Sequence, residues 1–212
     1  MKHSKIGFVT GLAAEARLLR RTEFAVAVGG GTPEGAWHAA ESLIEGGALA
    51  LVSFGLAGGL RPGLLPGTVL VPSAVFESKQ TYTCDNWLME LLGGGTGRPI
   101  LAGYRIAATA GDKALLYRRG RADAIDLESG AVARVATARG VPFAVLRAVA
   151  DPAERNLPPA ALAGLKEDGG IDLPRILLSV LGQPGQIAAL LEIGRDAARA
   201  RRALAARVKR IK

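Results

Sequence analysis

The chain has 212 residues, 49% of them hydrophobic, and its 27 lysines and arginines against 19 acidic residues give a formal net charge of +8. This length and apolar content predict one domain with a sizeable core. A single cysteine excludes an internal disulfide, and with only two histidines the chain has too few soft ligands for a zinc site, so we expect neither a metal nor another cofactor.

The basic charge is concentrated near the C-terminus. Aromatic residues make up only 5% of the chain, so stacking platforms for bases are scarce and we expect no nucleic acid partner. The N-terminal residues lack the pattern of an export signal, and apolar runs such as residues 47–60 are too short to span a bilayer, so we expect a cytoplasmic protein. The cations after residue 194 are Arg195, Arg199, Arg201, Arg202, Arg207, Lys209, Arg210 and Lys212.

Short β-rich runs alternate with helical patterns along the first 150 residues. Thr32 and Pro33 predict the start of a helix, with threonine as N-cap and proline in the first turn. In chain order we predict strand 6–9, helix 13–20, strand 24–28, helix 33–45, strands 48–54, 68–76 and 105–110, helix 113–118, strand 124–127, helix 130–139 and strand 141–150.

The predicted strands are almost continuously apolar, which is typical of strands covered on both faces. We therefore predict a single-domain three-layer α/β/α sandwich with a mixed, largely parallel central sheet over residues 1–183. Residues 184–212 read as a basic amphipathic helix. That helix either packs on the body with its charged face in solvent or contacts an anionic membrane surface.

Acidic residues follow three of the predicted strands, at the sheet edge where open α/β sheets bind ligands. Glu15 follows the first strand, Asp126 and Glu128 lie two residues apart where they would share one face of an extended strand, and Asp151 closes the last strand. Each taken alone has an ordinary structural explanation: Glu15 as a first-turn helix acid, Asp126 or Glu128 as a helix cap. As a cluster beside apolar neighbours, they favour functional use.

Other residues and motifs narrow the chemistry. Arg147, the one charge in its strand, reads as a buried ion-pair partner for such an acid, and His38 reads as structural. Residues 29–35 lack the dinucleotide-binding spacing, and the chain has neither a phosphate-loop Gly-Lys-Ser/Thr ending nor a nucleophile elbow. A cluster of carboxylates without a metal suits a sugar with hydroxyls and a base that leaves protonated.

Four ordered motifs resemble the purine nucleoside phosphorylase and methylthioadenosine/S-adenosylhomocysteine nucleosidase superfamily. They are residues 6–15, the glycine-rich segment 55–60 with 67–72, residues 126–131 and residues 147–151. The resemblance implies cleavage of the N-glycosidic bond of a purine nucleoside by a homo-oligomer. Within the superfamily the chain is most similar to hopanoid-associated phosphorylases, through residues 151–159 and 167–172, which implies a lipid-linked substrate, adenosylhopane, and release of adenine.

Site roles follow from the resemblance residue by residue. Asp151 would protonate N7 of the departing purine, Glu128 would bind the ribose hydroxyls and stabilise an oxocarbenium-like sugar, and Glu15 would activate a water. The backbone of Ala114 and Leu115 would meet the base edge. The remaining substrate-binding positions implied are Leu127, Asp126, Gly58 and Ala57.

Two departures from the family pattern affect phosphate. Leu56 stands where nucleosidases often carry a hydroxyl residue, and Ser53 replaces the arginine of some phosphorylases. A turn through Gly30, Gly31 and Thr32, ahead of a helix N-terminus, would still offer an anion site, so phosphate is a candidate co-substrate. A base-stacking aromatic is also missing near Ala114.

Three functional hypotheses therefore remain. The first is purine release from a 5′-substituted adenosine by phosphate or water, on adenosylhopane or on a methylthioadenosine/S-adenosylhomocysteine-type substrate. The second is a relative that binds nucleoside or lipid without turnover. The third, a basic nucleic-acid module, predicts affinity that falls steeply with salt.

Overall fold

The computed structural model describes residues 5–163 and 173–211. Within these residues nine strands form one mixed sheet in which β2, β1, β3, β8, β7, β5 and β6 lie side by side, while β9 pairs with β3 and β4. The strands are β1 Ile6–Thr10, β2 Ala25–Val28, β3 Ala50–Gly59, β4 Val69–Leu70, β5 Ala74–Glu77, β6 Gln80–Thr83, β7 Ile100–Ala102, β8 Ala124–Asp126 and β9 Phe143–Asp151.

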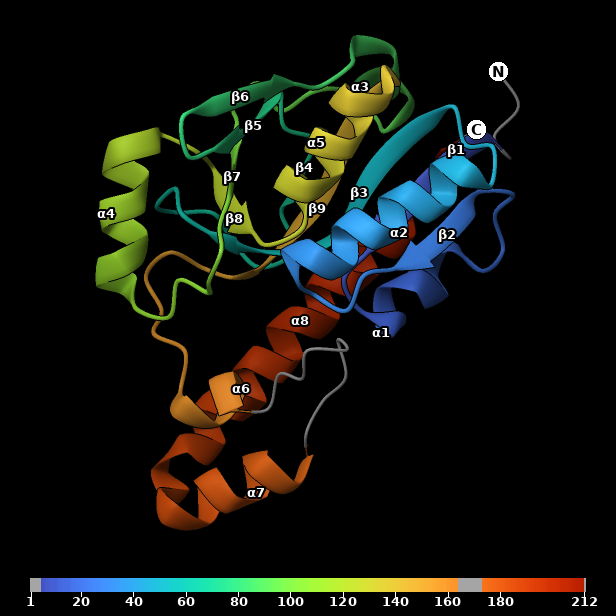
Figure 1. The fold of residues 1–212 in the computed structure, drawn as a ribbon. Coiled ribbons are helices and arrows are strands. Elements are labelled where there is room, and N and C mark those ends of the chain that lie inside the picture. The colour runs from blue at the N-terminus through green and yellow to red at the C-terminus, as the bar shows by residue number, and fades with distance from the viewer. Residues whose placement is uncertain (1–4, 164–172, 212) are drawn as a thin grey trace.

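Helices cover both faces of this sheet. Figure 1 shows α2 and α5 over its near face and α8 behind it, which confirms the predicted three-layer α/β/α sandwich. The helices are α1 Ala13–Ala16, α2 Pro33–Glu45, α3 Asn86–Leu91, α4 Ala110–Gly120, α5 Ser129–Arg139, α6 Pro159–Ala163, α7 Leu173–Gly182 and α8 Ile187–Val208, with 3-10 turns at Arg17–Leu19 and Pro184–Gln186.

The long strand β3 organises the sheet. Residues 50–54 of β3 pair in parallel with β1, residues 51–58 pair in parallel with β9, and its last two residues, Gly58 and Gly59, pair antiparallel with β8 on the side that β1 leaves open. The β3–β9 register shifts between Ala57 and Gly58. Such an irregularity bends a strand and increases its twist, and here it falls beyond the end of β1, where β3 begins to pair with β8.

Two predicted strands do not form as expected. The stretch 68–76 is split into β4 and β5, because Pro72 between them has no N–H for a sheet ladder. Residues 105–109 form no strand. Thr109 instead caps α4, its hydroxyl accepting a hydrogen bond from the Asp112 N–H (3.0 Å). The nearest strand is β7, which ends at Ala102. Helix 113–118 starts earlier than predicted, at Ala110.

Several short elements were not predicted. They are the β5–β6 hairpin, α3 and α6, and also α7. By contrast, α2 has the predicted bounds and cap, with the Thr32 hydroxyl accepting a hydrogen bond from the Gly35 N–H at 3.1 Å. Residues 167–172, part of the hopanoid-associated resemblance, lie outside the described residues.

The C-terminal helix α8 packs on the body through its apolar stripe. Ala200, Leu204 and Val208 are buried in the main core, and α8 contacts β9 and β3. Its exposed side carries arginines such as Arg195 and Arg202. None of the described helices is long and apolar enough to cross a membrane.

Candidate active site

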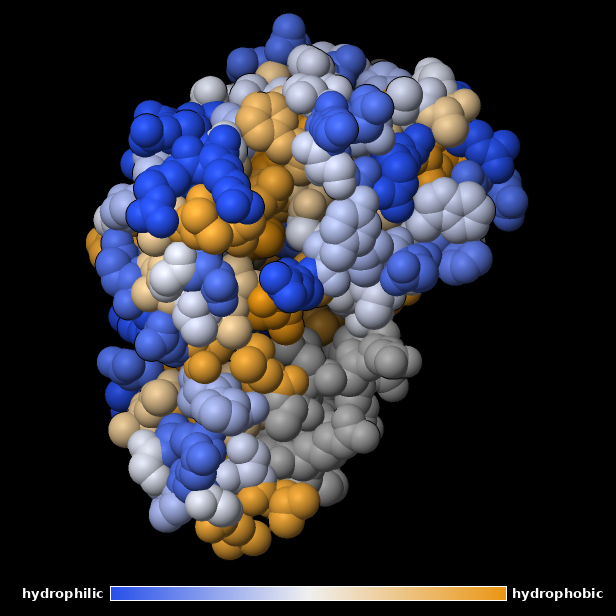
Figure 2. Space-filling view, turned by 60° about the vertical axis from the view of Figure 1, so that its left-hand side comes forward, coloured by the Kyte–Doolittle hydropathy of each residue, from blue (hydrophilic) through white to orange (hydrophobic). Residues whose placement is uncertain are grey.

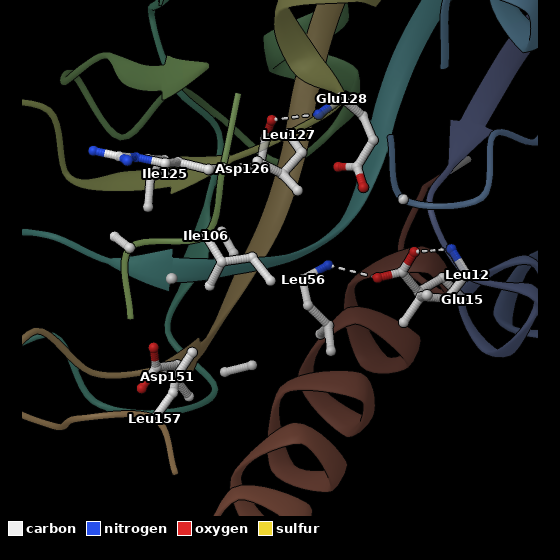
Figure 3. A pocket seen from close by; sticks show the side chains of 16 residues that line it. Leu12, Glu15, Leu56, Ile106, Ile125, Asp126, Leu127, Glu128, Asp151 and Leu157 are labelled. Atoms are coloured by element: carbon white, nitrogen blue, oxygen red, sulfur yellow. Dashed lines mark hydrogen bonds between the residues drawn. The ribbon is translucent and has the colours of Figure 1, made fainter. Parts of the chain in front are cut away.

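A cavity of about 230 Å³ opens where β1, β3 and β9 end. Glu15, Asp126, Glu128 and Asp151 all line it, although they are far apart in the sequence. Figure 3 shows Glu15 and Glu128 toward one side and Asp151 on the opposite side, beside Leu157. The apolar part of the lining comes from Leu12, Leu56, Ala57, Ile106, Ala107, Ile125, Leu127, Ala150 and Leu157.

Glu15 is held by backbone N–H groups from two elements. Its Oε2 accepts from Leu12 N (2.9 Å), as in a helix capping box, and its Oε1 accepts from Leu56 N (2.8 Å) at the irregular end of β3. Burial raises the pKa of this carboxyl above its ordinary value, although Arg147 and these N–H groups lower it. Glu15 therefore does act as a first-turn acid of α1, and its hydrogen bond to β3 also fixes the orientation of its carboxylate at the cavity.

The buried guanidinium of Arg147 joins the acids of β8 and α5. Its Nε donates to Asp126 Oδ2 (2.8 Å), and its Nη2 donates to Glu128 Oε2 (2.8 Å) and to Ser53 Oγ (2.7 Å). The predicted ion-pair role of Arg147 is confirmed. Ser53, where some phosphorylases have arginine, here supports Arg147 from within β3.

The prediction that Asp126 and Glu128 share one face of a strand is wrong. Strand β8 ends at Asp126, whose Oδ1 accepts from the N–H groups of Glu128 (3.0 Å) and Ser129 (2.8 Å) and so caps α5. The chain therefore turns at Glu128, whose side chain reaches the cavity. The Asp126 carboxylate, also at the cavity wall, is engaged by the α5 cap and by Arg147.

Burial, against the opposing effect of Arg147 and together with the charges of Asp126 and Glu15, raises the pKa of Glu128 to about 7. Its Oε1 faces the bare backbone of the turn after β1, since a Cβ added at Gly11 would lie 2.4 Å from it. Only glycine leaves room for that carboxylate.

Asp151, at the end of β9, has two unlike carboxylate oxygens. Oδ2 accepts a short hydrogen bond from Nζ of Lys113 in α4, whereas the buried Oδ1 has no hydrogen-bond partner among the described residues. Burial raises the pKa of Asp151, and Lys113 and Arg155 lower it. An aspartate that keeps its proton to higher pH than usual suits a general acid.

Some expected site residues do not reach the cavity. Ala114 and Leu115 lie within α4 and do not line it; Arg105, Ile106 and Ala107 of the preceding loop do. This shift follows from the absence of the predicted strand over 105–110. Gly58, Ala57 and Leu127, for which the resemblance implies substrate contacts, line the cavity.

The expected anion turn reaches the cavity at one residue. Gly31 lines it, whereas Gly30 and Thr32 do not, and the Thr32 hydroxyl is engaged in capping α2. Gly30 and Gly31 have φ of 75° and 77°, the left-handed region that glycine tolerates best. Among the described residues, no group of three histidine, cysteine, aspartate or glutamate side chains could hold a metal ion.

Sequence reasoning missed two cations of this region. Lys113 binds Asp151, and Arg105 lines the cavity from a loop. Lys113 carried no signal, because a lysine in a helix usually marks the solvent side. Arg105 was assigned to a strand that does not form.

The fold is similar to that of solved nucleosidases. A 5′-methylthioadenosine/S-adenosylhomocysteine nucleosidase from Helicobacter pylori matches with a TM-score of 0.68 at 16% identity, covering 99% of each chain. The corresponding enzyme from Colwellia psychrerythraea, in complex with adenine, gives 0.67 at 18% identity over 86% of this chain and 96% of that one. A futalosine hydrolase from Helicobacter pylori gives 0.65 at 18% identity, over 84% and 97%.

No protein with a curated description matches the chain. The family profile described as the phosphorylase superfamily, however, matches residues 7–115 and 96–169, which include every acid at the cavity. Because this match spans most of the chain, and the sheet and helices agree with it, the protein belongs to the phosphorylase superfamily.

Proposed function

We propose that the chain cleaves the N-glycosidic bond of a purine nucleoside. The observation that carries this proposal is the placement of three acids around one cavity, with Asp151 facing Glu15 and Glu128 across it. A general acid at one end and carboxylates at the other suit a substrate whose base leaves and whose sugar develops positive charge.

The raised pKa of Asp151 favours a protonated carboxyl that donates to N7, so that a neutral purine departs. Glu128, with a pKa of about 7, is substantially ionised at neutral pH and accepts hydrogen bonds from ribose hydroxyls. Its negative charge also stabilises an oxocarbenium-like sugar. Asp126 and Arg147 hold Glu128 in place rather than contact the reacting atoms.

The nucleophile is water or phosphate, and a different feature supports each. Glu15, fixed by two backbone N–H groups and with a raised pKa, suits the removal of a proton from water. The turn through Gly31, ahead of the N-terminus of α2, suits an anion. We infer that water is the primary nucleophile, because Ser53 and Arg147 are committed to each other rather than to an anion.

The 5′ substituent is proposed to be apolar. Leucine, isoleucine and alanine side chains form much of the cavity lining, and such surface favours an alkyl or lipid group over a charged one. Adenosylhopane, implied by the sequence resemblance, and methylthioadenosine both fit this class. They differ in the size of the 5′ group, so their relative kcat/KM distinguishes a lipid substrate from a small one.

The test incubates purified protein with adenosine, methylthioadenosine and adenosylhopane, each with and without phosphate, and measures free adenine. We expect adenine from a 5′-substituted substrate without phosphate; a strict phosphate requirement would assign the reaction to phosphorolysis. Asp151→Asn is expected to lower kcat by about 10²–10⁴-fold with adenine binding retained. Asp112→Asn, which changes an exposed aspartate of α4, is the matched control.

Retained turnover in Asp151→Asn would reject this mechanism. Absence of turnover in the unmodified chain, with nucleoside binding intact, would instead support the non-catalytic hypothesis. Binding of nucleic acid that weakens steeply with salt and does not respond to Asp151→Asn would support the third hypothesis.

We also propose two associations, a homo-oligomer and a peripheral contact with anionic membrane. The apolar stripe of α8 is occupied by the core, so any membrane contact uses other surfaces. Figure 2 shows apolar side chains gathered at the end of the molecule formed by α7, where Leu178 and Leu181 are 72% and 79% exposed. Exposed arginines of α8, such as Arg195 and Arg202, supply positive charge that an anionic surface would attract.

A further inference from the structure

Lys113 is an unusual lysine because its side chain is fully buried in the protein. Its Nζ has three N–H donors, and three acceptors surround it: Asp151 Oδ2, Pro152 O (2.9 Å) and Arg155 O (2.9 Å). A buried ammonium is costly unless paired and fully hydrogen-bonded, and this one meets both conditions. The site is therefore built around a cation.

The effect on Asp151 follows from what lysine can do. An ammonium only donates, so the Asp151 oxygen that it touches must accept. That oxygen is Oδ2, and the other, Oδ1, is buried without a partner among the described residues. When Asp151 is protonated, the proton is therefore directed to Oδ1, the oxygen left free for a ligand.

We propose that Lys113 is a positioning residue that fixes which oxygen of Asp151 carries the acidic proton and holds that oxygen toward the leaving purine. This inference rests on the proposed function. In the step it serves, the proton moves from Oδ1 to N7, the C1′–N9 bond breaks with its electron pair passing to the purine, and the base leaves neutral. Water then adds to C1′, its proton passes to Glu15, and Lys113 compensates the negative charge left on Asp151.

A structural alternative also exists, because Lys113 is one of several ties between α4 and the loop that follows β9. The N–H of Ala110 donates to Asn156 Oδ1 (2.7 Å), and the N–H of Leu157 donates to Ala108 O (2.8 Å). These ties place Leu157 against the cavity without touching Asp151. The test must therefore separate a tether from a group that acts on the acid.

A pH profile makes this separation. The charged groups around Asp151 are Lys113 from α4, Arg155 from the following loop and Asp196 from α8, and within the described part of the chain only Lys113 hydrogen-bonds to the carboxylate. Lys113 lowers the pKa of Asp151, so its removal raises that pKa and the acid stays protonated to higher pH. The basic limb of kcat/KM then moves to higher pH, by about 1 to 3 pH units for loss of an adjacent cation.

The experiment compares Lys113→Met, Lys113→Gln and Asn156→Ala with the unmodified chain, using adenine release from the best substrate between pH 5 and 10. For Lys113→Met we expect kcat to fall about tenfold or more and the basic limb to move upward. Lys113→Gln keeps one neutral donor for Oδ2, so we expect part of kcat to return while the limb stays displaced. Asn156→Ala loosens the loop and leaves the limb in place.

An unmoved basic limb in both Lys113 variants would overturn the inference and leave Lys113 a tether. If Lys113→Met does not fold, as judged by circular dichroism, Lys113→Gln alone decides the outcome. Asp151→Asn, run in parallel, tests the proposed function separately. Full turnover in that variant rejects the proposed function, whereas lost turnover with unmoved limbs rejects only the role of Lys113.

Discussion

Three carboxylates, those of Glu15, Asp126 and Glu128, surround one buried guanidinium, that of Arg147. Asp126 is satisfied by Arg147 and by the α5 cap, so the excess negative charge falls on the two glutamates. Burial keeps the pKa values of both glutamates above the ordinary range, and at Glu128 the charges of Asp126 and Glu15 add to this effect. A group that changes charge near neutrality at a cavity is suited to catalysis, and it costs stability when ionised.

The Glu128→Gln substitution tests whether ionisation of Glu128 lowers the stability of the fold. The folded-state pKa of Glu128, about 7, lies above the ordinary 4.5, so folding favours the protonated form and its contribution to stability is lost as pH rises through this window. A neutral glutamine removes that loss. The Tm of Glu128→Gln minus that of the unmodified chain should therefore be larger at pH 8 than at pH 5, while turnover of the variant is lower at both pH values.

The control is Glu90→Gln, a substitution of an exposed glutamate in α3. Its Tm difference from the unmodified chain should be the same at pH 5 and pH 8. An equally pH-independent difference for Glu128→Gln would contradict the raised pKa.

The sequence predicted which acidic residues lie at the site, but it did not predict how their side chains are arranged. Glu15, Glu128 and Asp151 follow strands, which placed them at one edge of the sheet. The sequence offered Asp126 as a helix cap only beside the alternative of a shared strand face, and the choice between them depends on hydrogen bonds to the N–H groups of Glu128 and Ser129. The partnership of Lys113 and Asp151, 38 residues apart, left no local pattern at all.

The secondary-structure elements differ in how strongly they depend on tertiary contacts. Helix α2, with a threonine cap and a proline in its first turn, and the apolar strands β3 and β9 were predicted because local signals and burial agree. β7 and the β5–β6 hairpin are short and form through pairing with neighbours, which residue patterns do not specify. Residues 105–109 have strand propensity but serve as the loop that lines the cavity.

Helix α8 gives a direct test of element packing, because it carries matched leucines. Leu204 is fully buried in the core, and Leu191 is 56% exposed. Leu204→Ala should lower the free energy of unfolding by about 2–5 kcal/mol, the usual cost of truncating a core leucine. Leu191→Ala should change it by no more than about 0.5 kcal/mol.

Denaturant titration of both variants measures these differences. Equal small effects would mean that α8 does not pack on β9 and β3 in solution. The apolar stripe of α8 would then be exposed and could contact a membrane.

The whole molecule combines a nucleoside-sized cavity with a basic helix and an apolar tip at α7. If its substrate resides in lipid, the exposed leucines Leu178 and Leu181 insert at the interface, while arginines add about 1 kcal/mol each on an anionic surface. The double substitution of both leucines by serine should lower co-sedimentation with phosphatidylserine vesicles. Leu65→Ser, at a leucine that is 71% exposed on the body, should not.

Sedimentation of the unmodified chain that does not depend on vesicles, or that is equal in both variants, would contradict the membrane contact. It would leave the cleavage of a small nucleoside unaffected. The class of fold was the most predictable property at this scale, because alternating apolar strands and helices admit few architectures. The association of whole molecules was the least predictable, since it depends on surfaces that the sequence does not distinguish.

We propose that one nucleoside fills the cavity between Asp151 and the glutamates Glu15 and Glu128. A crystal structure of the chain with a stable purine nucleoside analogue that resists cleavage would show where the base and the sugar lie. We expect N7 within hydrogen-bond distance of Asp151 Oδ1, and the 2′- and 3′-hydroxyls on Glu128. An analogue bound elsewhere, or bound with its base at Glu128 and its sugar at Asp151, would contradict it.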